Sequence, residues 1–66
     1  MNFEFGLGHR DGSVSGPFPT EEEMQKNLPK FYGSPVGRSI IGGIIGPWYD
    51  LDPVNGLTYK NPLYKN

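Results

Sequence analysis

The amino-acid sequence predicts a mostly irregular, extended chain with little regular structure. It also predicts two short α-helices, at about residues 21–27 and 35–46, and a short β-hairpin at about residues 49–60. The 66 residues include ten glycines and seven prolines, which disfavour long regular elements because glycine loses the most backbone freedom on folding and proline lacks a backbone N–H group. Only 35% of the residues are hydrophobic, and a chain this short buries only about 60% of its unfolded surface. We therefore expect no large independent core.

The chain also lacks the crosslinks that stabilise many small proteins. It has no cysteine and a single histidine, His9, which excludes disulfides, thiolate metal sites and a site built from several histidines. We expect no cofactor. The remaining source of buried surface is a partner. We therefore expect the chain to bind a larger protein complex and to be unstable as an isolated monomer.

The charge of the chain is nearly balanced. Six basic and seven acidic residues give a formal net charge of −1, and no two lysines or arginines are adjacent. The basic patch of a nucleic-acid-binding protein is therefore missing. The first residues do not combine a basic stretch with an apolar run, as a secretory signal would. We expect a location peripheral to a membrane complex, on its cytoplasmic or stromal side, rather than secretion.

The chain is predicted to be a single small unit of four segments. The first, residues 1–16, is predicted to be an extended, glycine-rich arm. In it Phe3, Phe5 and Leu7 alternate with polar or small residues, as on one face of a short strand. We expect this arm to add to a sheet edge or to lie along a partner; a flexible tail is the alternative.

The second segment, residues 17–33, is predicted to be a capped short helix followed by a turn. Thr20 is a good N-cap, and Glu23 stands three residues later, as in a capping box. Pro29 is expected to close the helix. Met24 and Leu28 form its narrow apolar face, so a helix of about two turns is marginal alone in water.

The third segment, residues 34–48, is predicted to be an isoleucine- and glycine-rich helix. Ser34 and Pro35 are typical of a helix start. The apolar residues recur in adjacent pairs four positions apart, which forms one stripe on a helix, whereas on a single strand paired isoleucines would point to opposite faces. Gly42 and Gly46 form a G-x-x-x-G pair on the other side, which would let a second surface approach closely. The stripe comprises Val36, Gly37, Ile40, Ile41, Ile44, Ile45 and Trp48.

Three interpretations of this segment remain open. It could lie in a groove of a protein partner and be buried on both faces. It could instead lie at a membrane interface, with Trp48 and Tyr49 as interfacial anchors. The third interpretation is a flexible glycine-rich loop whose isoleucines pack on the small core of the chain. A membrane span is excluded, because a helix of about 12 residues is roughly 18 Å long.

The fourth segment, residues 49–66, is predicted to be a turn or hairpin followed by an extended C-terminal arm. Asp52 and Pro53 suit the first two positions of a turn, and Asn55 and Gly56 supply the remaining backbone angles. A hairpin of residues 49–52 and 57–60 follows. Beyond it, the exposed aromatic and apolar residues of the arm are suited to a surface groove, with a frayed tail as the alternative.

The residues do not indicate an enzyme. The segment GRSIIGG lacks the lysine and hydroxyl residue of a phosphate-binding loop. Ser13 and Ser15 lie close to His9 in the chain, but in a glycine-rich segment that the sequence gives no reason to consider rigid, and catalytic groups need fixed positions. His9 as an axial ligand to a pigment or haem is a minor alternative.

Together these features predict a non-catalytic accessory subunit that docks in extended form on a larger assembly and stabilises or links its subunits. With its extended aromatic arms, Gly-Pro turns and one short glycine-faced helix, the chain resembles in style the small extrinsic subunits of membrane energy-converting complexes, photosynthetic or respiratory. An independent peripheral membrane peptide and a minor structural protein of a virus particle are the alternatives. The predicted partner-binding residues are Phe3, Phe5, Ile40, Ile41, Gly42, Ile44, Ile45, Gly46, Trp48, Tyr49, Tyr59, Leu63 and Tyr64.

Overall fold

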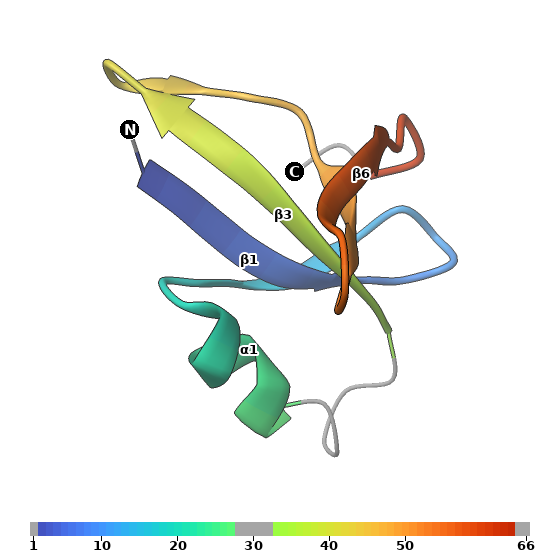
Figure 1. Ribbon diagram of the computed structural model, residues 1–66. Coiled ribbons are helices and arrows are strands. Elements are labelled where there is room, and N and C mark those ends of the chain that lie inside the picture. The colour runs from blue at the N-terminus through green and yellow to red at the C-terminus, as the bar shows by residue number, and fades with distance from the viewer. Residues whose placement is uncertain (1, 28–32, 65–66) are drawn as a thin grey trace.

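The computed structural model describes residues 2–27 and 33–64. Within these ranges the chain forms an antiparallel β-sheet of six strands and one short α-helix (Figure 1). In chain order the elements are β1 (Asn2–Gly8), β2 (Val14–Phe18), α1 (Glu21–Asn27), β3 (Ser34–Ile41), β4 (Ile44–Ile45), β5 (Tyr49–Asp52) and β6 (Gly56–Lys60).

The strands pair in the order β2-β1-β3-β5-β6, and β4 pairs with the far end of β3. The centre of the sheet is the long antiparallel pair of β1 and β3, which runs from Asn2 opposite Ile40 to Gly8 opposite Ser34. Residues 2–8 are thus a strand, as the alternation of Phe3, Phe5 and Leu7 predicted. The strand pairs inside the sheet of this chain, so it is not an arm reaching away from it.

The prediction of a mostly irregular, extended chain with two helices is wrong. Residues 34–45 are the β3–β4 hairpin, and its turn is Gly42-Gly43, with φ of 56° and 80°. Positive φ at both central residues gives a turn whose twist matches the flanking strands, and Gly-Gly is one of its preferred sequences. The isoleucines therefore pair across the turn, Ile40 with Ile45 and Ile41 with Ile44. Each pair shares one face of the hairpin, although adjacent isoleucines of a single strand point to opposite faces.

The buried side chains lie on both faces of the sheet. Leu7, Met24, Val36 and Trp48 are the buried hydrophobic residues among those that the structure describes. Met24 of α1 covers one face, where it borders a small cavity together with Pro35 of β3. Val36 lies on the other face, opposite Gly6, where a Cβ on Gly6 would stand 3.3 Å from the Trp48 ring. The small core is thus divided between two thin layers.

The helix predicted at residues 21–27 is confirmed. Helix α1 has these bounds, and the Thr20 hydroxyl oxygen accepts a hydrogen bond of 3.1 Å from the backbone N–H of Glu23. This bond satisfies one of the free N–H groups of the first turn. Met24 is buried, as its place on the apolar face predicted. The predicted roles of Leu28 and Pro29 fall outside the described residues.

The predicted hairpin at residues 49–60 is also confirmed, as strands β5 and β6. The Asp52 carboxylate begins its turn by accepting hydrogen bonds from the backbone N–H groups of Val54 (2.7 Å) and Asn55 (3.2 Å). Gly56 completes the turn with φ of 77°. Local polar chemistry therefore fixes this turn, as the sequence indicated.

A glycine in β3 lets the β5–β6 hairpin close over one face of the sheet. A Cβ on Gly37 would stand 2.7 Å from Leu57 Cδ2 and 3.4 Å from Phe5 Cδ1. The absence of a side chain at this position allows Leu57 of β6 to approach Phe5 of β1. Figure 1 shows this hairpin crossing the end of the β1–β3 pair that is distant from the β3–β4 turn.

Candidate interaction surface

The end of the β3–β4 hairpin carries three exposed isoleucines. Ile41, Ile44 and Ile45 are 53%, 75% and 57% exposed, and we refer to them as the isoleucine tip. Strand β4 has only two residues. A Cβ built on Gly42 or Gly43 would meet no atom within 4 Å, so the turn projects from the body of the fold. Single exposed apolar residues are common, but a contiguous group of large ones is typical of an interaction surface. Ile41 and Ile44, which pair across the turn, form such a group on one face, and Ile45 lies on the other face beside Ile40.

The apolar surface continues from the tip onto β1. Phe3 is 43% exposed and lies opposite Ser39, so it shares a face with Ile41, two residues further along β3. Ile40 is half-buried on the other face, opposite Asn2. Six predicted partner-binding residues therefore gather at one end of the molecule. They are Phe3, Ile40, Ile41, Gly42, Ile44 and Ile45.

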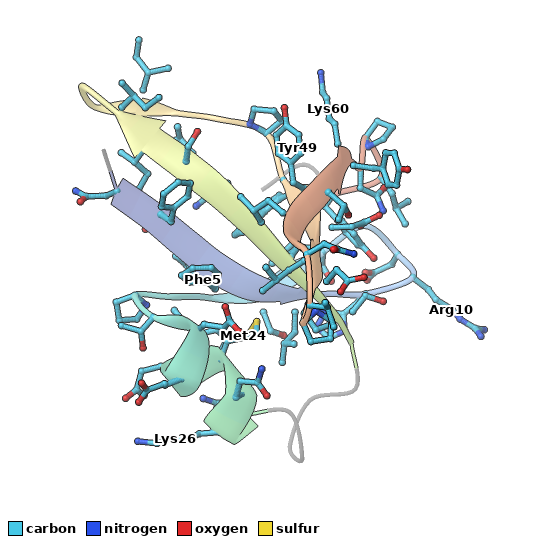
Figure 2. The ribbon with its side chains drawn as sticks, viewed as in Figure 1. Phe5, Arg10, Met24, Lys26, Tyr49 and Lys60 are labelled. Carbon is cyan, nitrogen blue, oxygen red and sulfur yellow. The ribbon has the colours of Figure 1, made fainter. Side chains whose placement is uncertain are left out.

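The described cations lie away from the isoleucine tip. Figure 2 labels Arg10, Lys26 and Lys60, and all three stand apart from the end of the β3–β4 hairpin. Arg38, the remaining described cation, is buried and forms an ion pair with Glu4. A surface that binds anionic lipid headgroups normally surrounds its apolar residues with lysine or arginine. In the described part of the chain the tip lacks such cations.

The prediction that Trp48 anchors a partner is not supported by its position. Trp48 is only 2% exposed and lies in the core of the chain. Its ring is covered by the Arg38 guanidinium, whose Nε and Nη2 atoms lie 3.0 and 2.9 Å from Glu4 Oε1. Sequence analysis did not identify this cluster, because Glu4 and Arg38 are 34 positions apart. The one available signal was a glutamate within an apolar strand.

The other predicted partner-binding residues lie elsewhere. Gly46 directly follows β4, and its backbone N–H donates a hydrogen bond of 2.8 Å to Ser39 O of β3, at the base of the hairpin. Tyr64 is half-buried with its ring over Gly8, at the end of β1 away from the tip. Tyr59 of β6 is 78% exposed, and Leu63 is also exposed. Phe5 and Tyr49 are half-buried. The structure thus does not join these residues into one surface.

Several hydrogen bonds form within and next to the loop between β1 and β2, residues 9–13. His9 Nε2 lies 2.6 Å from Ser15 Oγ, and the His9 backbone N–H donates to Ser13 O. The Asp11 carboxylate accepts from the Ser13 hydroxyl (2.6 Å) and backbone N–H (2.9 Å). These two bonds lower the pKa of Asp11 below its usual value. The acidic residue of this loop therefore bonds to Ser13, and one ring nitrogen of His9, the residue considered as an axial ligand, bonds to Ser15.

Two further features bear on possible sites. Residues 2–27 and 33–64 contain no helix that is long and apolar enough to cross a membrane. The same residues bring together no group of three or more acidic, histidine or cysteine side chains that could hold a metal ion.

Comparisons with known proteins give no relative from which a function could be inferred. No protein-family model matches the chain, and no similar sequence among curated proteins or similar solved structure was found. The interaction surface is therefore interpreted from its own residues.

Proposed function

We propose that this protein is a non-catalytic accessory subunit that docks on a larger protein assembly through the isoleucine tip. It docks as a folded sheet rather than in extended form. The observation that carries the proposal is the exposure of Ile41, Ile44 and Ile45 on one short hairpin. Fully burying an isoleucine side chain contributes about 1.5 to 3 kcal/mol. Ile41, Ile44 and the neighbouring Phe3 lie on one face of the sheet and suffice for a small hydrophobic hot spot, and Ile45 adds exposed apolar surface on the other face.

A protein partner is favoured over a lipid surface by charge. Membrane association through one short apolar loop is weak unless basic residues add attraction to anionic headgroups. The described cations lie away from the tip (Figure 2). Peripheral membrane binding is the second candidate, supported by the way the tip projects beyond the sheet. An assembly that converts energy in a membrane remains one prediction for the partner, and a virus particle is another.

Docking also compensates for the small core. Only four hydrophobic side chains are buried among the described residues, and a partner that binds only the folded form shifts the unfolding equilibrium by mass action. We therefore propose that the isolated chain is only marginally stable and that binding to its partner makes the folded form more stable.

The test compares the wild-type chain with two variants expressed in cells of its natural source. Ile44→Ser removes the most exposed isoleucine of the tip. Val54→Ser is the matched control, because Val54 is 87% exposed but lies in the turn between β5 and β6. Tagged proteins are purified from membrane and soluble extracts, and copurifying proteins are quantified by mass spectrometry. Circular dichroism confirms that each variant is folded.

We expect a stoichiometric partner with the wild type and Val54→Ser, and at least a tenfold loss of that partner with Ile44→Ser. The same partner at the same yield with all three proteins would exclude docking through the tip. Flotation with vesicles of neutral and anionic phospholipid tests the second candidate. Vesicle binding that Ile44→Ser abolishes, without a protein partner, would favour the membrane.

A further inference from the structure

One edge of the central strand β1 is open at its beginning. Strand β3 pairs with every residue of β1, from Asn2 to Gly8. On the other side, β2 reaches only as far as Phe5, opposite Phe18. After Phe18 the chain turns away at Pro19 and enters α1. Over the described ranges, residues 2–4 therefore have no strand neighbour on this side.

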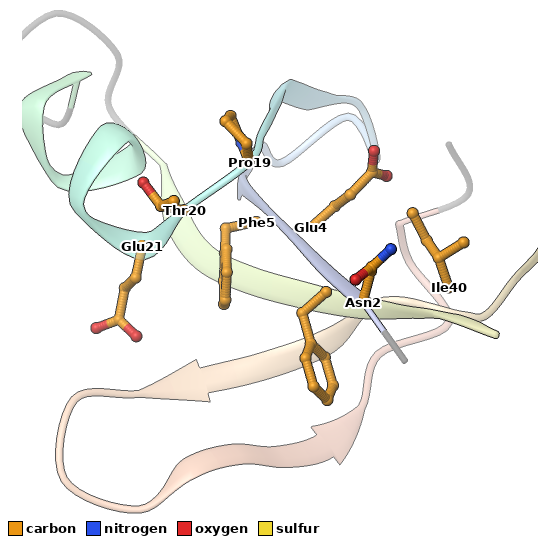
Figure 3. Close-up of a pocket in the computed structure, with 8 residues that line it drawn as sticks. Asn2, Glu4, Phe5, Pro19, Thr20, Glu21 and Ile40 are labelled. Carbon is orange, nitrogen blue, oxygen red and sulfur yellow. The ribbon is translucent and has the colours of Figure 1, made fainter.

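A groove of about 570 Å³ lies at this open edge (Figure 3). Its lining includes residues 2–5 of β1, the start of α1 and Ile40 of β3. Phe3 and Phe5 belong to one face of the sheet, whereas Asn2 and its cross-strand neighbour Ile40 belong to the other. Figure 3 shows Phe5 and Glu21 pointing to one side and Glu4 pointing to the other. The empty space thus lies beside β1, where the next strand of the sheet would lie.

We propose that the groove receives an extended segment of a partner protein, which adds to β1 as a further strand. This inference deepens the proposed function and rests on it, because it names how the docking partner is held next to the isoleucine tip. The main chain of the segment pairs with residues 2–4, at the usual strand spacing of about 4.8 Å. Its alternate side chains contact Phe3 and Phe5 on one face and Ile40 on the other.

The charged residues that line the groove indicate which residue types the bound segment should contain. The ionisable residues of the lining are Glu4 and Glu21. The Glu4 carboxylate is already paired with Arg38, whereas Glu21 is exposed. An exposed carboxylate beside an apolar groove favours a lysine or arginine in the bound segment. We therefore expect a segment that alternates apolar and basic residues.

The outer edge of β2 is a poorer place for a strand to add. Strand β2 contains Pro17, which has no N–H group to donate to a neighbouring strand. Proline is a common means of protecting an edge from unwanted pairing. Residues 2–4 of β1 contain no proline, so their backbone can pair.

The test uses a capped synthetic hexapeptide of alternating lysine and valine as the probe, titrated into the ¹⁵N-labelled full chain. A control hexapeptide has proline in place of each valine, so that it keeps the charge but cannot form a strand. We expect the first peptide to shift the amide signals of residues 2–5 and of Thr20 and Glu21, and to slow hydrogen exchange within residues 2–4. The proline peptide should leave both unchanged.

Two charge reversals test the specificity of the groove. Glu21→Lys should weaken the affinity for the lysine–valine peptide at least fivefold. Glu22→Lys, an equal change at a residue of the same helical turn that does not line the groove, should weaken it less than twofold. Three outcomes would each overturn the proposal. They are equal effects of the two variants, equal shifts with the proline peptide, and no shifts at about 1 mM peptide, a concentration that corresponds to a binding free energy of about −4 kcal/mol.

Failure of strand addition at the groove is distinguishable from failure of docking through the isoleucine tip. Ile44→Ser removes part of the tip but leaves the groove intact, so it should not change the peptide affinity. Peptide binding without tip-dependent copurification would support the groove and reject the tip. Tip-dependent copurification without peptide binding would reject the groove alone.

Discussion

The guanidinium of Arg38 lies over the ring of Trp48, 4.3 Å from its centroid. The same guanidinium contacts Glu4 through two nitrogens, so one buried cation joins β1, β3 and the tryptophan that precedes β5. Arginine suits this place because its planar group can stack on a ring and still donate hydrogen bonds at its edge. The cluster explains why Trp48, the largest apolar residue of the chain, belongs to the core rather than to an interface.

Replacing Glu4 by glutamine should destabilise the fold by about 1 to 2 kcal/mol, because it weakens a charge-assisted bond to a buried guanidinium. Urea unfolding followed by tryptophan fluorescence would measure this change. Glu22→Gln is the control, because Glu22 is exposed, and it should stay within about 0.5 kcal/mol of the wild type. Equal stabilities of all three proteins would show that the negative charge of Glu4 contributes nothing to the fold.

Gly42→Ala distinguishes the hairpin from the helix that the sequence predicted. In a helix, alanine would stabilise this position by about 0.5 to 1 kcal/mol. In the hairpin the residue has φ of 56°, where an L side chain costs roughly 1 to 2 kcal/mol. We expect destabilisation, measured as a lower urea midpoint. Gly42→Asn should be better tolerated, since asparagine is favoured in such turns, and a stabilising alanine would contradict the hairpin.

Gly37→Ala should destabilise the chain by about 1 to 3 kcal/mol, because the added methyl group would collide with Leu57 Cδ2. A double-mutant cycle with Leu57→Ala tests this cause. If the collision is responsible, Gly37→Ala should cost at least 0.5 kcal/mol less, as an order-of-magnitude expectation, when residue 57 is already alanine. Additive costs would place the strain elsewhere.

Asp52 should show a titration that depends on folding. Hydrogen bonds from the backbone N–H groups of Val54 and Asn55 lower its pKa below the usual value. Because the pKa is lower in the folded state, these bonds stabilise the fold above the unfolded-state pKa. That contribution is lost as pH falls through the folded-state pKa. NMR titration of the side-chain carboxyl carbon, in buffer and in urea, measures the difference.

We expect the Asp52 midpoint to lie at lower pH in buffer than in urea. Asp52→Ala removes the acceptor and should flatten the dependence of the unfolding free energy on pH in the acidic range. Identical midpoints in the folded and unfolded chains would show that the two hydrogen bonds do not distinguish the protonation states of this carboxyl group.

The sequence alone determined the features that depend on a few neighbouring residues, namely the cap of α1 and the β5–β6 turn. Thr20 caps α1 through a bond to a residue three positions later, and Asp52 bonds to groups two and three positions later. Such contacts join residues only two or three positions apart, so the helix and the β5–β6 hairpin could be predicted with their positions. Most of the candidate surface was also named, because large apolar residues in a polar chain stand out.

Tertiary structure alone decided the rest. The paired isoleucines fit a helical stripe as well as a hairpin, and the choice depends on whether β3 pairs with β1, whose residues lie 26 (Gly8 and Ser34) to 38 (Asn2 and Ile40) positions away from their partners. No local pattern encodes that pairing, the ion pair of Glu4 with Arg38, or the open edge at residues 2–4. Burial of Trp48 likewise depends on segments that meet only in the folded chain. The physical reason is that backbone pairing in a sheet is satisfied between distant segments, whereas caps and turns are satisfied within one.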